Sequence, residues 1–90
     1  MKSASQYSSQ VNADGTTVDV LAIEGYAPAN LDASSPAYYG FVDAAGNWYI
    51  QRATTSSTVT TYEFVKGSSG YAAAWTGRVA QSYDIYSAIF

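Results

Sequence analysis

Residues 38–52 read YYGFVDAAGNWYIQR, and this stretch decides the fold. Two runs rich in β-forming residues, 37–43 and 48–54, flank the short segment 44–47. Asp43 suits the first position of a turn because its carboxylate can accept a bond from a backbone N–H two residues on. Gly46 can take the left-handed conformation that closes such a turn. The sequence therefore predicts a β-hairpin with a nearly fixed register.

Both faces of this hairpin carry aromatic side chains, because successive residues of a strand point to opposite sides. The first strand has Tyr39 and Phe41 on one face and Tyr38 and Val42 on the other, and the second has Trp48, Ile50 and Arg52 on one face and Tyr49 and Gln51 on the other. Such a hairpin is either central in a two-layer structure or has one face on a partner chain. The sequence leaves both arrangements open.

Length and composition limit the remaining possibilities. Ninety residues make one domain, and with no cysteine its stability depends on aromatic packing or on oligomerisation. The net charge of −3 comes with no cluster of basic residues, which argues against nucleic-acid binding. No apolar run is long enough to cross a membrane, and residues 1–10 lack the apolar core of a signal peptide, so we expect synthesis in the cytoplasm.

Further strands are predicted on both sides of the central hairpin. Residues 1–6 are expected to form a flexible or docking arm, and residues 7–90 a single β-rich domain. Strands are expected at 7–11 and 16–23, joined by a turn in which Asn12 and Gly15 repeat the pattern of Asp43 and Gly46. Residues 28–36 contain two prolines and are predicted to form a loop. A strand at 58–66 ends at the segment GSSG.

The residues after 70 change period. Large side chains recur every three to four residues from Tyr71, which favours a short helix over 71–80, although Gly77 and the β-branched tail would also suit a strand. We expect an extended or loosely turned tail whose apolar end docks on the chain itself or on a neighbour. The candidates for a contact between subunits are Tyr83, Ile85, Tyr86, Ile89 and Phe90. The fold class is therefore mainly β, a small antiparallel sandwich or barrel of about five to six strands that can end in a short C-terminal helix.

The residue types argue against catalysis. Without histidine or cysteine the chain lacks the commonest general base, the thiol nucleophile and the usual zinc ligands. Paired carboxylates could hydrolyse a glycoside, and the candidates are Asp19, Glu24, Asp43 and Glu63. Asp43 is better explained by its turn, and Asp19 and Glu63 by solvent-facing strand positions. Asp14 and Asp43 lack the spacing of a calcium loop. We therefore expect no enzyme activity, no cofactor and no metal.

Aromatic residues allow a second hypothesis, a carbohydrate-binding or host-attachment module. Nine Tyr and two Trp in a chain rich in Ser and Thr are typical of recognition surfaces, but ordinary core and strand-face positions explain them better. The residues that could stack on a sugar are Tyr26, Tyr38, Trp48 and Trp75, and they would need to form a coplanar exposed row. Arg52 and Arg78 follow aromatic residues and could stack on them, pair across an interface or pair within the fold.

Several short motifs resemble a group of small β-rich proteins of tailed bacteriophages. They are GYAP at 25–28, WYIQR at 48–52, a Thr-rich strand from 58, and the pattern G-Y-x-x-x-W-x-x-R at 70–78 followed by Ser-Tyr at 82–83. The resemblance covers residues 18–85, and the segment 28–36 is longer than the pattern. It implies a structural or accessory role in the virion, as in capsid decoration, head fibre, neck or tail. The implied partners are other virion proteins and further copies of the chain, with host surface glycans as an option.

Overall fold

The structure, a computed structural model, describes residues 6–12, 15, 17–34 and 36–90. Strands β1 (Gln6–Val11) and β2 (Thr17–Ala22) form an antiparallel two-stranded sheet. Strands β3 (Tyr26–Asp32), β4 (Ala37–Asp43), β5 (Trp48–Ser56) and β6 (Val59–Gly67) form an antiparallel sheet in the order β3-β4-β5-β6. The prediction of a mainly β fold is confirmed. The sheets do not close into a barrel.

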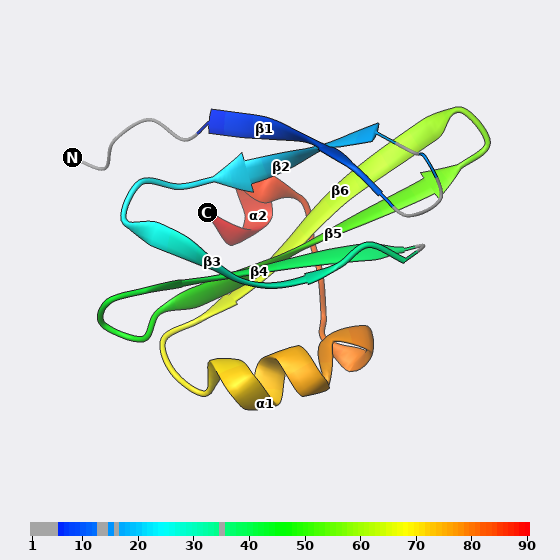
Figure 1. Ribbon diagram of the computed structural model, residues 1–90. Helices are drawn as coiled ribbons and strands as arrows, with labels where there is room; N and C mark the ends of the chain where they lie inside the picture. Colours follow the sequence, from blue (N-terminus) through cyan, green and yellow to red (C-terminus); the bar gives the residue numbers. More distant parts are fainter. Residues whose placement is uncertain (1–5, 13–14, 16, 35) are drawn as a thin grey trace.

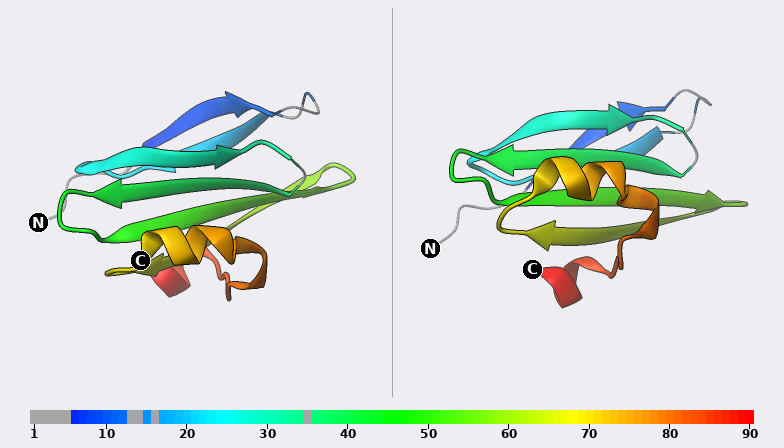
Figure 2. Two further views of the ribbon diagram at one scale, coloured as in Figure 1. Left: turned by 60° about the horizontal axis from the view of Figure 1, so that its bottom comes forward. Right: turned by 90° about the horizontal axis from the view of Figure 1, so that it is seen from below.

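The elements form three layers (Figures 1 and 2). The β1–β2 hairpin lies over one face of the four-stranded sheet, and helix α1 (Tyr71–Thr76) lies under the other face. After a 3-10 turn (Arg78–Ala80) the chain passes β6 and ends in a short helix, α2 (Tyr86–Ile89). The predicted hairpin supplies the two central strands of the large sheet.

The turn between β4 and β5 has the predicted chemistry. The N–H of Gly46 donates to the carbonyl of Asp43 over 3.2 Å, and Gly46 has a φ of 94°. The Asp43 carboxylate accepts from the N–H groups of Ala45 and Asn47, both at 2.9 Å. These bonds, led by those with Asn47, lower the pKa of Asp43. The corresponding turn between β1 and β2 has a bond from the N–H of Gly15 to the carbonyl of Asn12 (2.9 Å).

Each face of the central hairpin is buried by another part of the same chain. One core contains Tyr39, Phe41 and Tyr49 and is covered by β2 and the C-terminal end. The other contains Trp48 and Ile50 and is covered by α1. Of the two arrangements that the sequence left open, the structure shows the central one. The hairpin therefore needs no partner chain to bury its aromatic side chains.

The predicted loop at 28–36 is wrong for most of its length, because residues 26–32 form β3. This strand lies at the edge of the sheet and is largely exposed, so it needs no apolar pattern. An edge strand also tolerates a proline, and the pairing with β4 shifts register between Pro28 and Asn30. The expected arm at 1–6 falls outside the described residues, apart from Gln6, which begins β1.

The helix after residue 70 is shorter than predicted. Helix α1 ends at Thr76 instead of residue 80, because Gly77 caps it with a bond from its N–H to the carbonyl of Ala73 (3.0 Å). The tail after it is partly extended and partly turned, as expected. Asp84 pairs with Phe64 on the outer edge of β6, and residues 86–89 then form a helical turn.

Candidate functional site

The inner edge of β2 is bound by side chains of the large sheet. The Gln51 amide lies between two backbone groups: its oxygen accepts from the N–H of Leu21 (2.6 Å), and its nitrogen donates to the carbonyl of Asp19 (2.7 Å). Gln51 is completely buried. A buried amide of this kind must have its bonds satisfied, and here the β2 backbone satisfies them.

Two tyrosines extend the same arrangement along β2. The Tyr49 hydroxyl donates to the carbonyl of Leu21 (2.7 Å) and accepts from the N–H of Ile23 (3.3 Å). The Tyr62 hydroxyl accepts from the N–H of Asp19 (3.1 Å). Burial raises the pKa of Tyr49 far above its ordinary value, so this hydroxyl keeps its proton. We call Tyr49, Gln51 and Tyr62 the side-chain ladder, since they replace a neighbouring strand for β2.

The side-chain ladder fixes the direction of the β1 backbone. Asp19 and Leu21 use their N–H and C=O groups toward the large sheet, and the residues opposite them on β1 are Ser9 and Tyr7. In an antiparallel pair such residues also point their backbone groups away from the partner strand. The backbone groups of Tyr7 and Ser9 therefore face outward, and no described residue bonds to them.

The other strand edges of the described chain are protected. On β3 the edge carries Pro28, which has no N–H, together with a shift of register. On β6 the backbone of Phe64 exchanges two bonds with Asp84, of 2.7 and 3.0 Å, and this strand also carries the charged residues Glu63 and Lys66. By contrast β1, with the sequence QYSSQV, has no charge, no proline and no register shift. It is the free edge of the molecule as far as the structure describes it.

A groove of about 240 Å³ lies between the small sheet and strands β3 and β4 of the large sheet. Its lining is mostly apolar: Val20 and Ala22 from β2, Pro28 and Leu31 from β3, and Tyr39 and Phe41 from β4, with Gln10 and Asn30 at its polar parts. Leu31 is 55% exposed although it is large and apolar. This groove could accept apolar side chains, but it holds no arrangement of charged groups.

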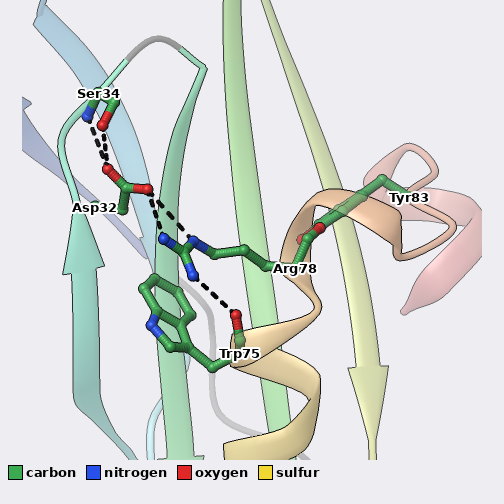
Figure 3. Close-up of polar contacts among 5 residues, drawn as sticks. All are labelled: Asp32, Ser34, Trp75, Arg78 and Tyr83. Atoms are coloured by element: carbon green, nitrogen blue, oxygen red, sulfur yellow. Dashed lines mark hydrogen bonds and ion pairs between the residues drawn. The ribbon is translucent and has the colours of Figure 1, made fainter.

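A cluster around Arg78 ties the end of α1 to the end of β3 (Figure 3). Its guanidinium donates to the Asp32 carboxylate (2.9 Å) and to the carbonyl of Trp75 (2.9 Å), and it lies 4.5 Å from the centre of the Trp75 ring. Asp32 also accepts from the hydroxyl and the N–H of Ser34. The Ser34 hydroxyl bond, and then Arg78, lower the pKa of Asp32. Tyr83 donates to the carbonyl of Arg78 (2.8 Å).

Arg52 has a similar structural role. It forms an ion pair with Glu63 on the neighbouring strand and lies 4.4 Å from the centre of the Tyr83 ring. Both arginines therefore pair within the fold, which is one of the arrangements that the sequence allowed. Glu63, one of the carboxylates considered for catalysis, belongs to this pair. Asp43 belongs to its turn.

The four residues predicted to stack on a sugar do not form a row. Tyr38 and Trp48 are buried, and the indole N–H of Trp48 donates to the carbonyl of Ser69 (2.7 Å). Tyr26 and Trp75 are half-buried and pack on opposite faces of the large sheet, Tyr26 in the Tyr49 core and Trp75 in the Ile50 core. The role of these rings in glycan binding therefore stays a prediction without support from their arrangement.

The five predicted interface residues divide into two groups. Tyr83, Ile89 and Phe90 pack on the protein's own cores, and the Phe90 ring lies 5.6 Å from that of Tyr49. Ile85 and Tyr86 remain exposed, at 54% and 41%. Contact between subunits remains a prediction for this segment. The structure adds that Phe90 packs on the core of its own chain.

The described residues hold no group of three or more acidic, histidine or cysteine side chains that could bind a metal. Among them there is likewise no helix with the length and apolarity to cross a membrane. Sequence reasoning missed the side-chain ladder and the free β1 edge. The local signal was a glutamine on the same strand face as the large aromatic side chain of Tyr49.

Comparison with protein-family models, with curated proteins and with solved structures finds no match to this chain.

Proposed function

We propose that the chain is a structural or accessory protein of a bacteriophage virion, for example in capsid decoration, a head fibre, the neck or the tail. It acts through contacts with further copies of itself and with other virion proteins, and its work is binding, not catalysis. It is made in the host cytoplasm and resides in the particle. The resemblance of its short motifs to small phage proteins supports this assignment.

One contrast in the structure carries the proposal. Several polar side chains are used inside the fold: both arginines are in ion pairs, and the buried amide of Gln51 holds β2. Meanwhile large apolar side chains remain at the surface, including Tyr7, Val11, Ile85 and Tyr86. Exposed apolar groups beside a free strand edge are typical of a protein that assembles.

The first test is the native mass of the purified chain, measured by light scattering over a dilution series. A closed oligomer or a filament is expected. The second is detection of the chain, by mass spectrometry, in density-purified particles of a phage that carries its gene. A monomer at every concentration, together with absence from the particles, would overturn the proposal. In that case binding to a glycan array would be the next measurement.

A further inference from the structure

We propose that two copies of the chain pair through the free edge of β1, antiparallel and about a two-fold axis, so that β2-β1-β1-β2 becomes one continuous sheet. This inference rests on the self-assembly part of the proposed function. The partner is a second copy because the edge is self-complementary in its backbone groups, its side chains and its charge. Each of these three properties can be read from the described residues.

The backbone supplies the first argument. Residues 7, 9 and 11 have the same parity, so their backbone groups share the outward direction established for Tyr7 and Ser9. The carbonyl of Val11 accepts from the exposed side-chain amide of Gln10 over 3.2 Å, and the second chain would replace this local bond. Pairing centred on Ser9 places Ser9 opposite its own copy and Tyr7 opposite Val11 of the other chain. This register pairs all three outward residues, whereas a register centred one residue away leaves one of them without a partner.

The side chains agree with that register. Tyr7 and Val11 are 50% and 64% exposed, and they lie on the same face of β1 at equal distances from Ser9. A two-fold axis through Ser9 therefore sets each tyrosine ring against a valine, a pair that stabilises antiparallel strands. The small serine lies at the axis, where its own copy comes closest. One contact thus covers two exposed apolar residues on each chain.

Charge is the third argument. Strand β1 has no charged residue, so self-pairing brings no like charges together at the edge. On the same face of the small sheet the acidic residue is Asp19, one strand behind Ser9. Three strand spacings would separate the two copies of Asp19 by about 14 Å, beyond the screening length of roughly 8 Å at physiological salt. The other edges could not pair in this way, because proline, charged residues, Asp84 or the side-chain ladder protect them.

Disulfide trapping tests the pairing directly, because the chain has no cysteine of its own. In a hydrogen-bonded antiparallel pair, opposite Cα atoms are about 5.5 Å apart, within the range of a disulfide. Under mild oxidation Ser9→Cys should therefore form a covalent dimer at least about ten times faster than the control Ser56→Cys, since pairing raises the effective concentration of the thiols. Ser56 is an equally exposed serine at the end of β5.

The register has its own test. Tyr7→Cys and Val11→Cys chains should each cross-link poorly alone and form a mixed dimer when combined. If the wild-type chain self-associates but Ser9→Cys reacts no faster than Ser56→Cys, the β1 pairing is wrong while the proposed assembly stands. If the wild-type chain is a monomer at all concentrations, the β1 pairing and the proposed self-assembly are both wrong. If β1 cross-links only to a different protein, the second copy is the wrong occupant.

Discussion

Replacing Gln51 by leucine removes the central member of the side-chain ladder while keeping a side chain of similar size. The amide makes two bonds to β2, one to the N–H of Leu21 and one to the carbonyl of Asp19. Leucine can make neither, and the site is closed to solvent because Gln51 is completely buried. The variant therefore leaves one donor and one acceptor of the β2 backbone without partners.

The cost follows from these two groups. An unsatisfied buried donor or acceptor destabilises the folded state by about 1–3 kcal/mol, and Asp19 is near the surface, so the expected loss is about 2–4 kcal/mol. In a domain of this size that corresponds to a decrease in Tm of roughly 10–20 °C. Urea unfolding followed by tryptophan fluorescence and thermal unfolding followed by circular dichroism would measure it.

Gln51→Glu gives the same site a pH dependence. A protonated carboxyl group can donate to the carbonyl of Asp19 and accept from the N–H of Leu21, whereas a carboxylate can only accept. Burial therefore raises the pKa of the introduced group above its value in the unfolded chain. The folded state then binds the proton more tightly, so its stability relative to the wild type is retained below about pH 4.3 and falls as the pH rises, by about 1.4 kcal/mol per pH unit.

The matched control is Gln81→Leu, at a half-buried glutamine whose side chain has no assigned hydrogen bond; its backbone N–H donates to the carbonyl of Arg78, a bond that leucine keeps. It should change the free energy of unfolding by less than about 0.5 kcal/mol. The reasoning would be refuted if Gln51→Leu cost no more than this control, or if the stability of Gln51→Glu followed the wild type at every pH. Either result would mean that the Gln51 amide contributes nothing to holding β2.

Three other changes have defined outcomes. Gly67→Ala should cost about 1–3 kcal/mol in urea unfolding, since its Cβ would lie 2.5 Å from the Trp48 ring. Asp32→Asn should cost about 0.2–1 kcal/mol at neutral pH, because its ion pair with Arg78 is partly exposed. That difference should disappear as the pH falls below 3.8 and through the lowered folded-state pKa, which thermal unfolding across the acidic range would show. Phe90→Ala should lower the stability of the isolated chain by about 1–2 kcal/mol, whereas a ring used only between subunits would leave it unchanged when measured at high dilution.

Local chemistry explains which parts of the fold could be predicted. The turn from Asp43 to Gly46 has its determinants within four residues, so the hairpin and the two faces of its strands could be read directly. Strand β3 could not be predicted in this way. It pairs with a neighbouring strand on one side alone and most of its side chains are exposed, so its residues resemble those of a loop. Its identity depends on β4, which lies beyond a turn.

The candidate site was hidden for a different reason. Gln51 was placed correctly on the Tyr49 face, but nothing near it in the sequence shows that its partners lie 30 and 32 residues away. The sequence does not show that the backbone groups of Tyr7 face outward, because their direction follows from the bonds that β2 makes to the large sheet. Periodicity predicts which face a side chain occupies, whereas the partners of a backbone group depend on the tertiary fold.

The side-chain ladder also divides the molecule into two cooperative units. Among the described residues, no backbone–backbone hydrogen bond joins a strand of one sheet to a strand of the other. The bond nearest to doing so runs from the N–H of Tyr26 to the carbonyl of Ile23, in the connection between β2 and β3. The β1–β2 hairpin can therefore separate with its own hydrogen bonds intact once the side-chain ladder and the bond from Tyr39 to Asn12 are broken and the apolar side chains of β2 leave the core. Amide hydrogen exchange in the native state should reveal this opening as a separate event, with the amides of Leu21 and Ile23 exchanging before those of β4 and β5. A protein built in this way can release its outermost sheet without unfolding its centre.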